Sequence, residues 1–168
     1  MPSGRPPILR RMPDGANQLR IRSDSDARTR AIGRALAALL RAGDVLVLEG
    51  PLGSGKTALV SGLGDGLGIA EAVTSPTFIL MRRHDSGFLP LVHVDAYRLG
   101  SLAEFDDLDV VEEASDGALA IEWGDIVADA LPEDRLHILL DGQGDEPREI
   151  TFTKAGSWRD RDLEGLLS

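Results

Sequence analysis

The segment from Gly50 to Thr57 constrains the fold of this 168-residue chain more than any other part of the sequence. It reads Gly-Pro-Leu-Gly-Ser-Gly-Lys-Thr, which is the complete G-x-x-x-x-G-K-[ST] pattern. Glycines in such a turn let successive backbone N–H groups surround a phosphate, while the following helix points its positive end at the same oxygens. The pattern therefore predicts a strand, a phosphate-binding turn and a helix in an α/β fold.

The sequence on both sides of this motif has the hydrophobic patterns that such a turn requires. Val45–Leu48 is a short, continuous apolar run, which is typical of a strand buried on both faces. After the motif, apolar residues recur at helical spacing as far as Leu67. In this context Lys56 is expected to neutralise the β- and γ-phosphates of a nucleoside triphosphate, and the Thr57 hydroxyl to hold Mg²⁺. The residues expected to contact the nucleotide are Gly50, Pro51, Leu52, Gly53, Ser54, Gly55, Lys56, Thr57 and Ala58.

Strand and helix patterns alternate through most of the remaining chain. A helix is predicted after Ser25, because apolar residues lie on one helical face from Ile32 to Leu40 and Gly43 follows as a stop signal. The acidic stretch Glu104–Asp116 is predicted to be a solvated helix or loop. The alternation predicts an α/β, P-loop NTPase-like three-layer sandwich, whose central sheet is mostly parallel with antiparallel edge strands. The further predicted strands are a hairpin of Thr77–Met81 and Phe88–Val94, two buried strands at Ala118–Glu122 and Leu136–Leu140, and an edge-like strand at Glu149–Thr153.

The composition fits one globular domain without covalent cross-links. Hydrophobic residues make up 42% of the chain, and no residue is cysteine, which excludes disulfides, thiolate zinc sites, iron–sulfur clusters and cysteine nucleophiles. Residues 1–18 contain four prolines and are predicted to be a flexible N-terminal extension, with residues 19–168 forming a single P-loop domain. No apolar run exceeds six residues and no signal-peptide core is present, so we expect a cytoplasmic protein with no membrane partner.

The net charge of −10 is distributed unevenly along the chain. The first 41 residues contain nine arginines and three acidic residues, which leaves the remainder strongly acidic. The N-terminal region is therefore either a solvated basic tail or an arm that meets nucleic acid or an acidic partner. Phosphate contacts need local lysines and arginines, so only this region could bind nucleic acid directly.

Two carboxylates follow predicted buried strands and are candidates for metal binding and catalysis. Asp95 follows the run Leu89–Val94, and Glu122 follows Ala118–Ile121. Open α/β sheets bind their ligands at the carboxyl ends of the strands, where both side chains are expected to lie. The alternative for each residue taken alone is that it only ends a strand or caps the next helix.

Other polar motifs predict no additional site. The segment Asp141–Gly144 contains the D-x-x-G fragment of GTPase switches, but the sequence has no N-K-x-D guanine-binding motif, which disfavours GTP as the ligand. The histidines His84, His93 and His137 lack the spacing of a metal site, so no zinc site is predicted.

Four sequence elements occur in the order found in a known protein family. They are Gly50–Thr57, Ser75-Pro76-Thr77-Phe78, His93-Val94-Asp95-Ala96-Tyr97-Arg98 and Glu122-Trp123. With this combination the chain resembles, from about Leu19 to Thr153, the TsaE (YjeE) family of small bacterial P-loop ATPases. The resemblance implies hydrolysis of ATP to ADP and phosphate, in association with the TsaD and TsaB proteins, during the synthesis of threonylcarbamoyladenosine on tRNA. It also implies that tRNA is met only through that complex.

The resemblance further assigns roles to individual residues. It implies that Thr57, Asp95 and Glu122 surround Mg²⁺, and that the two carboxylates act in catalysis together with Lys56. The S-P-T-F element is implied to be a switch-like loop near the γ-phosphate, in which Thr77 orients water or metal.

Two other functions are compatible with the same phosphate-binding motif. A small-molecule P-loop kinase needs an acceptor pocket and an arginine-bearing lid, and neither is evident between Asp125 and the carboxyl end. A nucleotide-dependent interaction module would bind ATP while hydrolysis is incidental. If the chain is an ATPase, either Arg98 or Arg82 completes the transition-state clamp within the chain, or a partner protein does so.

Overall fold

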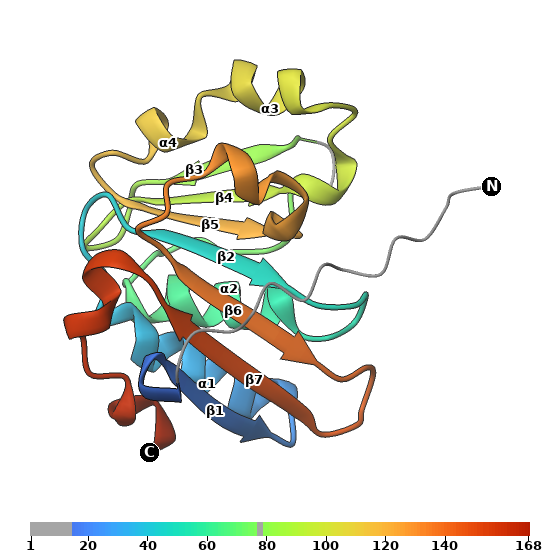
Figure 1. Cartoon of the computed structure of the whole chain (residues 1–168), viewed down its shortest axis with the longest axis vertical. Helices are drawn as coiled ribbons and strands as arrows, with labels where there is room; N and C mark the ends of the chain where they lie inside the picture. Colours follow the sequence, from blue (N-terminus) through green and yellow to red (C-terminus); the bar gives the residue numbers. More distant parts are fainter. Residues whose placement is uncertain (1–14, 77–78) are drawn as a thin grey trace.

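One mixed sheet of seven strands forms the centre of the molecule. A computed structural model describes residues 15–76 and 79–168, and its strands are ordered β1-β7-β6-β2-β5-β4-β3 (Figure 1). The strands are β1 Gln18–Ser23, β2 Val45–Glu49, β3 Met81–His84, β4 Leu91–Asp95, β5 Ala118–Glu122, β6 Leu136–Asp141 and β7 Arg148–Lys154.

The four central strands of this sheet are parallel, and its two edges are antiparallel. Strands β6, β2, β5 and β4 run in one direction, whereas β7 and β1 are added antiparallel on one side and β3 on the other. This arrangement confirms the predicted α/β fold with antiparallel edge strands. Because parallel strands end at the same edge of a sheet, the carboxyl ends of β2, β4 and β5 lie together.

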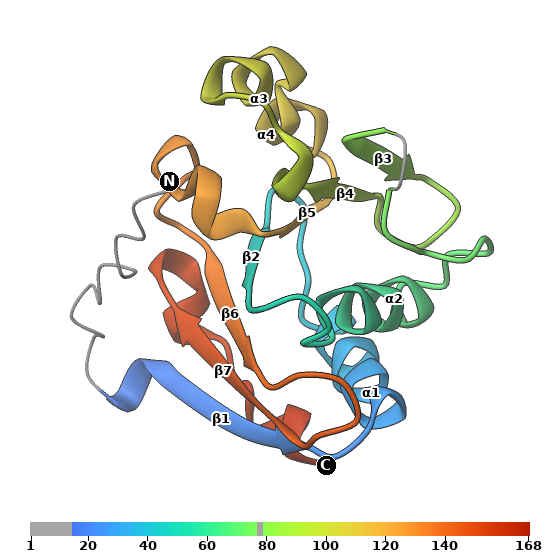
Figure 2. The same cartoon turned by 90° about the vertical axis from the view of Figure 1, so that its right-hand side faces the viewer.

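Helices cover both faces of the sheet and complete three layers. On one face, α1 (Asp26–Ala37) and α2 (Lys56–Gly66) lie side by side and share an apolar core with the strands (Figure 2). On the other face, α3 (Leu102–Leu108), α4 (Val110–Glu113) and the 3-10 helix η3 (Gly124–Ala130) pack against β2, β4 and β5. No helix in residues 15–76 and 79–168 is long and apolar enough to cross a membrane. The other 3-10 helices are η1 Gly15–Asn17, η2 Ala96–Arg98, η4 Gly156–Asp160 and η5 Glu164–Leu167.

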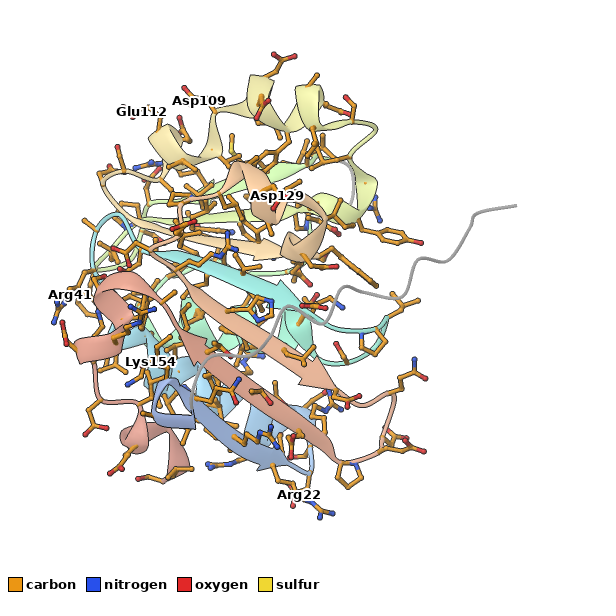
Figure 3. The ribbon with its side chains drawn as sticks, viewed as in Figure 1. Arg22, Arg41, Asp109, Glu112, Asp129 and Lys154 are labelled. Atoms are coloured by element: carbon orange, nitrogen blue, oxygen red, sulfur yellow. The ribbon has the colours of Figure 1, made fainter. Side chains whose placement is uncertain are left out.

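The acidic stretch from Glu104 to Asp116 forms most of α3, all of α4 and the turns beside them. Phe105 and Val110 anchor it to the core, and both are buried. Asp109 and Glu112 lie at the outer end of the molecule, away from the sheet (Figure 3). The predicted solvated helix is therefore confirmed, with two apolar anchors that hold it on the sheet.

Glycines permit a close approach of α1 and α2. The Ser25 hydroxyl begins α1 by accepting a hydrogen bond of 3.1 Å from the backbone N–H of Arg28. Further along, a Cβ at Gly33 would overlap the Leu59 carbonyl oxygen, and a Cβ at Gly62 would overlap that of Arg30. The two helices therefore pack backbone against backbone, which fixes α2 and the loop before it.

Three details differ from the sequence-based expectations. Strand β1 was not predicted, because the prolines upstream obscured the alternation of apolar and charged residues in Gln18–Ser23. Strand β7, predicted as an edge strand over Glu149–Thr153, pairs with β1 on one side and β6 on the other. Its alternating pattern arises from one partly solvated face of the sheet. The hairpin exists, but its first strand is Met81–His84 and not Thr77–Met81, and residues 77 and 78 lie outside the described residues.

Replacing Gly33 by alanine is expected to destabilise the fold, because the new Cβ must push the backbone of α2 away. The overlap costs about 1–3 kcal/mol, while the higher helix propensity of alanine returns at most about 1 kcal/mol, so the net effect is a loss. Gly165→Ala is the control, since a Cβ there has no described neighbour within 4 Å. Urea unfolding followed by circular dichroism measures both variants, and equal stabilities would contradict the packing argument.

Candidate functional site

The loop between β2 and α2 has the conformation of a phosphate-binding turn. Gly55 precedes the first residue of α2 with φ +100°, in the left-handed region that favours glycine. A side chain at Gly55 would also overlap the guanidinium group of Arg148. The N–H groups of the first helical turn have no carbonyl partner within the helix, so they are available to bind an anion.

A cavity of about 460 Å³ lies over this loop. Its walls come from the loop, from the first turn of α2 and from the carboxyl ends of β4 and β5. All the expected nucleotide-binding residues except Gly50 and Pro51 line it, and so do Asp95 and Glu122. The remaining lining residues are Asp26, Ser75, Tyr97, Arg98 and Trp123.

Lys56 is buried at the base of the loop and contacts the loop's own backbone. Its Nζ donates hydrogen bonds to the carbonyl oxygens of Gly50 (2.6 Å) and Pro51 (2.9 Å). The same ammonium group lies 4.0 Å from the ring centroid of Trp123, close enough for a cation–π interaction. Burial lowers the pKa of Lys56, although the nearby carboxylates, Glu122 first among them, oppose this effect. The Lys56 ammonium group is therefore buried, and it donates its hydrogen bonds to carbonyl oxygens of the loop itself.

Glu122 and Thr57 contact each other through a hydrogen bond at the cavity wall. The Thr57 hydroxyl donates a hydrogen bond of 2.7 Å to Oε1 of Glu122. The other carboxylate oxygen, Oε2, lies 2.6 Å from Nε2 of His93, whose ring is completely buried. Only 3% of Glu122 is exposed, so these two contacts fix the orientation of its carboxylate beside the first turn of α2.

Asp95 lies beside Glu122 and has a double role. The two residues are direct partners in the parallel pairing of β4 and β5. Asp95 accepts hydrogen bonds from the Ser75 hydroxyl (3.3 Å) and from the backbone N–H of Tyr97 (3.1 Å). It therefore caps η2, as the alternative interpretation expected, and it also lines the cavity.

The oxygen donors at this wall suit a hard divalent cation. Mg²⁺ prefers oxygen ligands, and proteins usually bind it through one or two carboxylates together with substrate phosphates. The Thr57 hydroxyl and the carboxylates of Asp95 and Glu122 form such a set on the cavity wall. Within the described residues, no group of three or more His, Cys, Asp or Glu side chains could hold a metal by itself. Among the described residues, the oxygen set on this wall is therefore incomplete, and phosphate oxygens would have to complete it.

Several contacts of this site could not be read from sequence patterns. No sequence pattern assigned a role to His93, whose buried ring orients Glu122. Arg148 contacts the loop although 94 residues separate it from Ser54. Of the two arginines considered for a transition-state clamp, Arg98 lines the cavity and Arg82 does not. Thr77 lies outside the described residues.

A second group of titratable residues surrounds Glu49, the last residue of β2. Nε2 of His137 is 2.9 Å from Oε2 of Glu49, and this hydrogen bond is the main cause of a lowered pKa of Glu49. The pKa of Asp125 is raised, first by burial and second by repulsion from Glu49. Glu49 directly precedes the phosphate-binding loop, so its charge is coupled to Asp125 across the end of β2.

Comparisons with known proteins agree on one family. A family model described as "Threonylcarbamoyl adenosine biosynthesis protein TsaE" matches residues 23–150. The tRNA threonylcarbamoyladenosine biosynthesis protein TsaE of Streptomyces coelicolor is 49% identical over 145 residues, covering 82% of this chain and 98% of that protein. The protein of the same name from Bacillus subtilis is 42% identical over 140 residues, covering 83% and 88%. The crystal structure of Bacillus subtilis YdiB matches with a TM-score of 0.69 and 39% identity, covering 83% of this chain and 86% of that chain.

Substituting Glu49 by glutamine is expected to lower the pKa of Asp125, because a like charge is removed while the effect of burial remains. Since the folded state holds the Asp125 proton above its ordinary pKa of 3.8, its stabilising contribution is present at acid pH and decreases as the pH rises through the raised pKa. The substitution should therefore weaken this pH dependence. Carboxyl ¹³C NMR titration measures the Asp125 pKa, and an unchanged or higher value would contradict the coupling.

Proposed function

Because this chain belongs to the TsaE family of threonylcarbamoyl adenosine biosynthesis proteins, we propose that it is the Mg²⁺-dependent ATPase of that process. Family membership gives it a role in tRNA threonylcarbamoyladenosine biosynthesis. The proposal adds that it hydrolyses ATP to ADP and phosphate in the cytoplasm, that it works with TsaD and TsaB, and that it meets tRNA through their complex.

One observation carries the ATPase proposal. The glycine turn before α2, the buried Lys56 and the pair of carboxylates on β4 and β5 all border a single cavity. A turn with a helix N-terminus binds phosphate oxygens through backbone N–H groups, and a lysine at its base neutralises their charge. The Asp95 and Glu122 carboxylates, beside the first turn of α2, would supply what a phosphate-binding loop alone lacks, namely ligands for the metal.

Each residue of the site would have a separate role in ATP hydrolysis. Lys56 exchanges the carbonyl oxygens of Gly50 and Pro51 for β- and γ-phosphate oxygens. Thr57, Asp95 and Glu122 would hold Mg²⁺, and the ion would supply positive charge beside the phosphate oxygens. A water oxygen then bonds to the γ-phosphorus as the bond from that phosphorus to the bridging oxygen breaks, which releases ADP, phosphate and a proton.

In this proposal a partner protein completes the site. Arg98 is the one arginine among the described residues that line the cavity, and its side chain is exposed. An exposed arginine needs to be ordered before it can stabilise charge on a transferring phosphoryl group. Binding to TsaD and TsaB would either order Arg98 or bring an arginine from the partner. Thr77, two residues after Ser75 in the sequence, remains the proposed residue for orienting water.

Lys56→Ala should reduce the affinity for MgATP by about tenfold to a hundredfold or more, because charged hydrogen bonds to the phosphates are lost. Lys154→Ala is the matched control, since Lys154 is the other lysine of the chain and its ammonium group bonds the Arg159 and Arg161 carbonyls instead. Isothermal titration calorimetry on the full chain measures both affinities. Unchanged binding in Lys56→Ala would refute the phosphate-binding assignment of the loop.

Adding purified TsaD and TsaB should raise the ATPase rate of this chain by at least about tenfold, since a clamping arginine in trans can accelerate such reactions a thousandfold or more. The rate is measured as phosphate release with Mg²⁺ and ATP, with Lys56→Ala in the same mixture to subtract hydrolysis by the partners. Equal rates with and without the two partner proteins would count against the partnership.

A further inference from the structure

Arg148, the first residue of β7, is buried behind the phosphate-binding loop. It is 3% exposed, although arginine is usually a surface residue. Its Nη1 donates a hydrogen bond of 2.9 Å to the carbonyl oxygen of Ser54, and its Nη2 donates one of 2.9 Å to the carbonyl oxygen of Gly144. Nη1 also lies 3.2 Å from a carboxylate oxygen of Asp26, at the start of α1. One guanidinium group thus joins three segments that are distant in sequence.

The loop between β6 and β7 is shaped to hold this arginine. Gly142 has φ +148°, and a Cβ there would lie 2.7 Å from Cβ of Arg148, so only glycine lets the loop close over the side chain. Gly144 supplies the carbonyl that accepts from Nη2. Figures 1 and 2 both show this loop beside the loop that precedes α2. The D-x-x-G segment therefore holds Arg148 and needs no role in guanine recognition.

The contact with Ser54 also sets the direction of a neighbouring N–H group. The carbonyl of Ser54 and the N–H of Gly55 belong to one planar trans peptide, so they point in opposite directions. The carbonyl points at Arg148, which does not line the cavity, whereas Ser54 and Gly55 both line it. Holding the carbonyl therefore keeps the Gly55 N–H directed away from Arg148.

We propose that Arg148 is a positioning residue for nucleotide binding. It fixes the Ser54–Gly55 peptide so that the Gly55 N–H donates to a phosphate oxygen of a nucleoside di- or triphosphate, and it ties this peptide to the β6–β7 loop and to α1. The proposal rests on the nucleotide binding proposed above and assigns a new residue to it. Free rotation of this peptide would otherwise have to be lost on binding, which lowers affinity.

The test compares two buried arginines by titrating the full chain with ADP. Arg148→Lys keeps the positive charge but loses the planar fork, and Arg148→Met also loses the charge. Arg161→Lys is the matched control, because Arg161 is 8% exposed and binds Asp44 at the amino end of β2, opposite to the phosphate-binding loop. We expect ADP affinity to fall about tenfold to a hundredfold in Arg148→Met and by less in Arg148→Lys. Arg161→Lys should bind like the wild type even where its melting temperature is lower.

A second measurement follows the Gly55 amide directly. In protein labelled with ¹⁵N-glycine, ADP should move the Gly55 amide proton downfield in the wild type and less in the Arg148 variants. If Arg148→Met does not fold, Arg148→Lys decides both measurements. Wild-type protein that does not bind ADP would overturn the proposed function and this inference together. Wild-type protein that binds ADP, with Arg148 variants that bind equally well or an Arg161 variant that is weakened as much, would overturn the role of Arg148 alone.

Discussion

The parallel pairing of β4, β5 and β2 is the constraint on which the site depends. It sets Asp95 opposite Glu122, and it places the end of β2, where the phosphate-binding loop begins, beside the end of β5. Side chains alternate between the faces of a strand, so a slip of one residue would turn one carboxylate away from α2. Such a slip would also move side chains that are packed in one apolar core into the core on the opposite face, where their shapes do not fit.

Three of the charged side chains buried around the loop differ in the partners that hold them. Burying a charge without a partner is costly, so each is held by hydrogen bonds. Glu122 is held by Thr57 and His93, and Arg148 by backbone carbonyls and Asp26. Lys56 donates hydrogen bonds to the Gly50 and Pro51 carbonyl oxygens of the loop itself. Glu122 and Arg148 are thus tied to distant parts of the fold, whereas the hydrogen-bond partners of Lys56 lie within the loop.

Sequence patterns predicted the central part of the fold well and its edges less well. The apolar run at Val45–Leu48 and the strand at Ala118–Glu122 appear where expected, because strands buried on both faces have a continuous apolar signal. The predicted position of β7 at the edge of the sheet was wrong, because an alternating pattern indicates a solvated face and does not distinguish an edge strand from an inner one. Strand β1 was missed because its short alternation follows a proline-rich stretch.

The sequence by itself determined the glycine-rich loop from Gly50 to Thr57 and the strand and helix that flank it. Its glycines, its lysine and the following helix act within a few residues of one another, so their conformation follows from local chemistry. Only the tertiary structure decided which distant side chains support the loop. His93 reaches Glu122 across 29 residues and Arg148 reaches Ser54 across 94, and both contacts exist because strand order and register bring their strands together. No local pattern records that order, since it results from how the whole sheet buries its apolar faces.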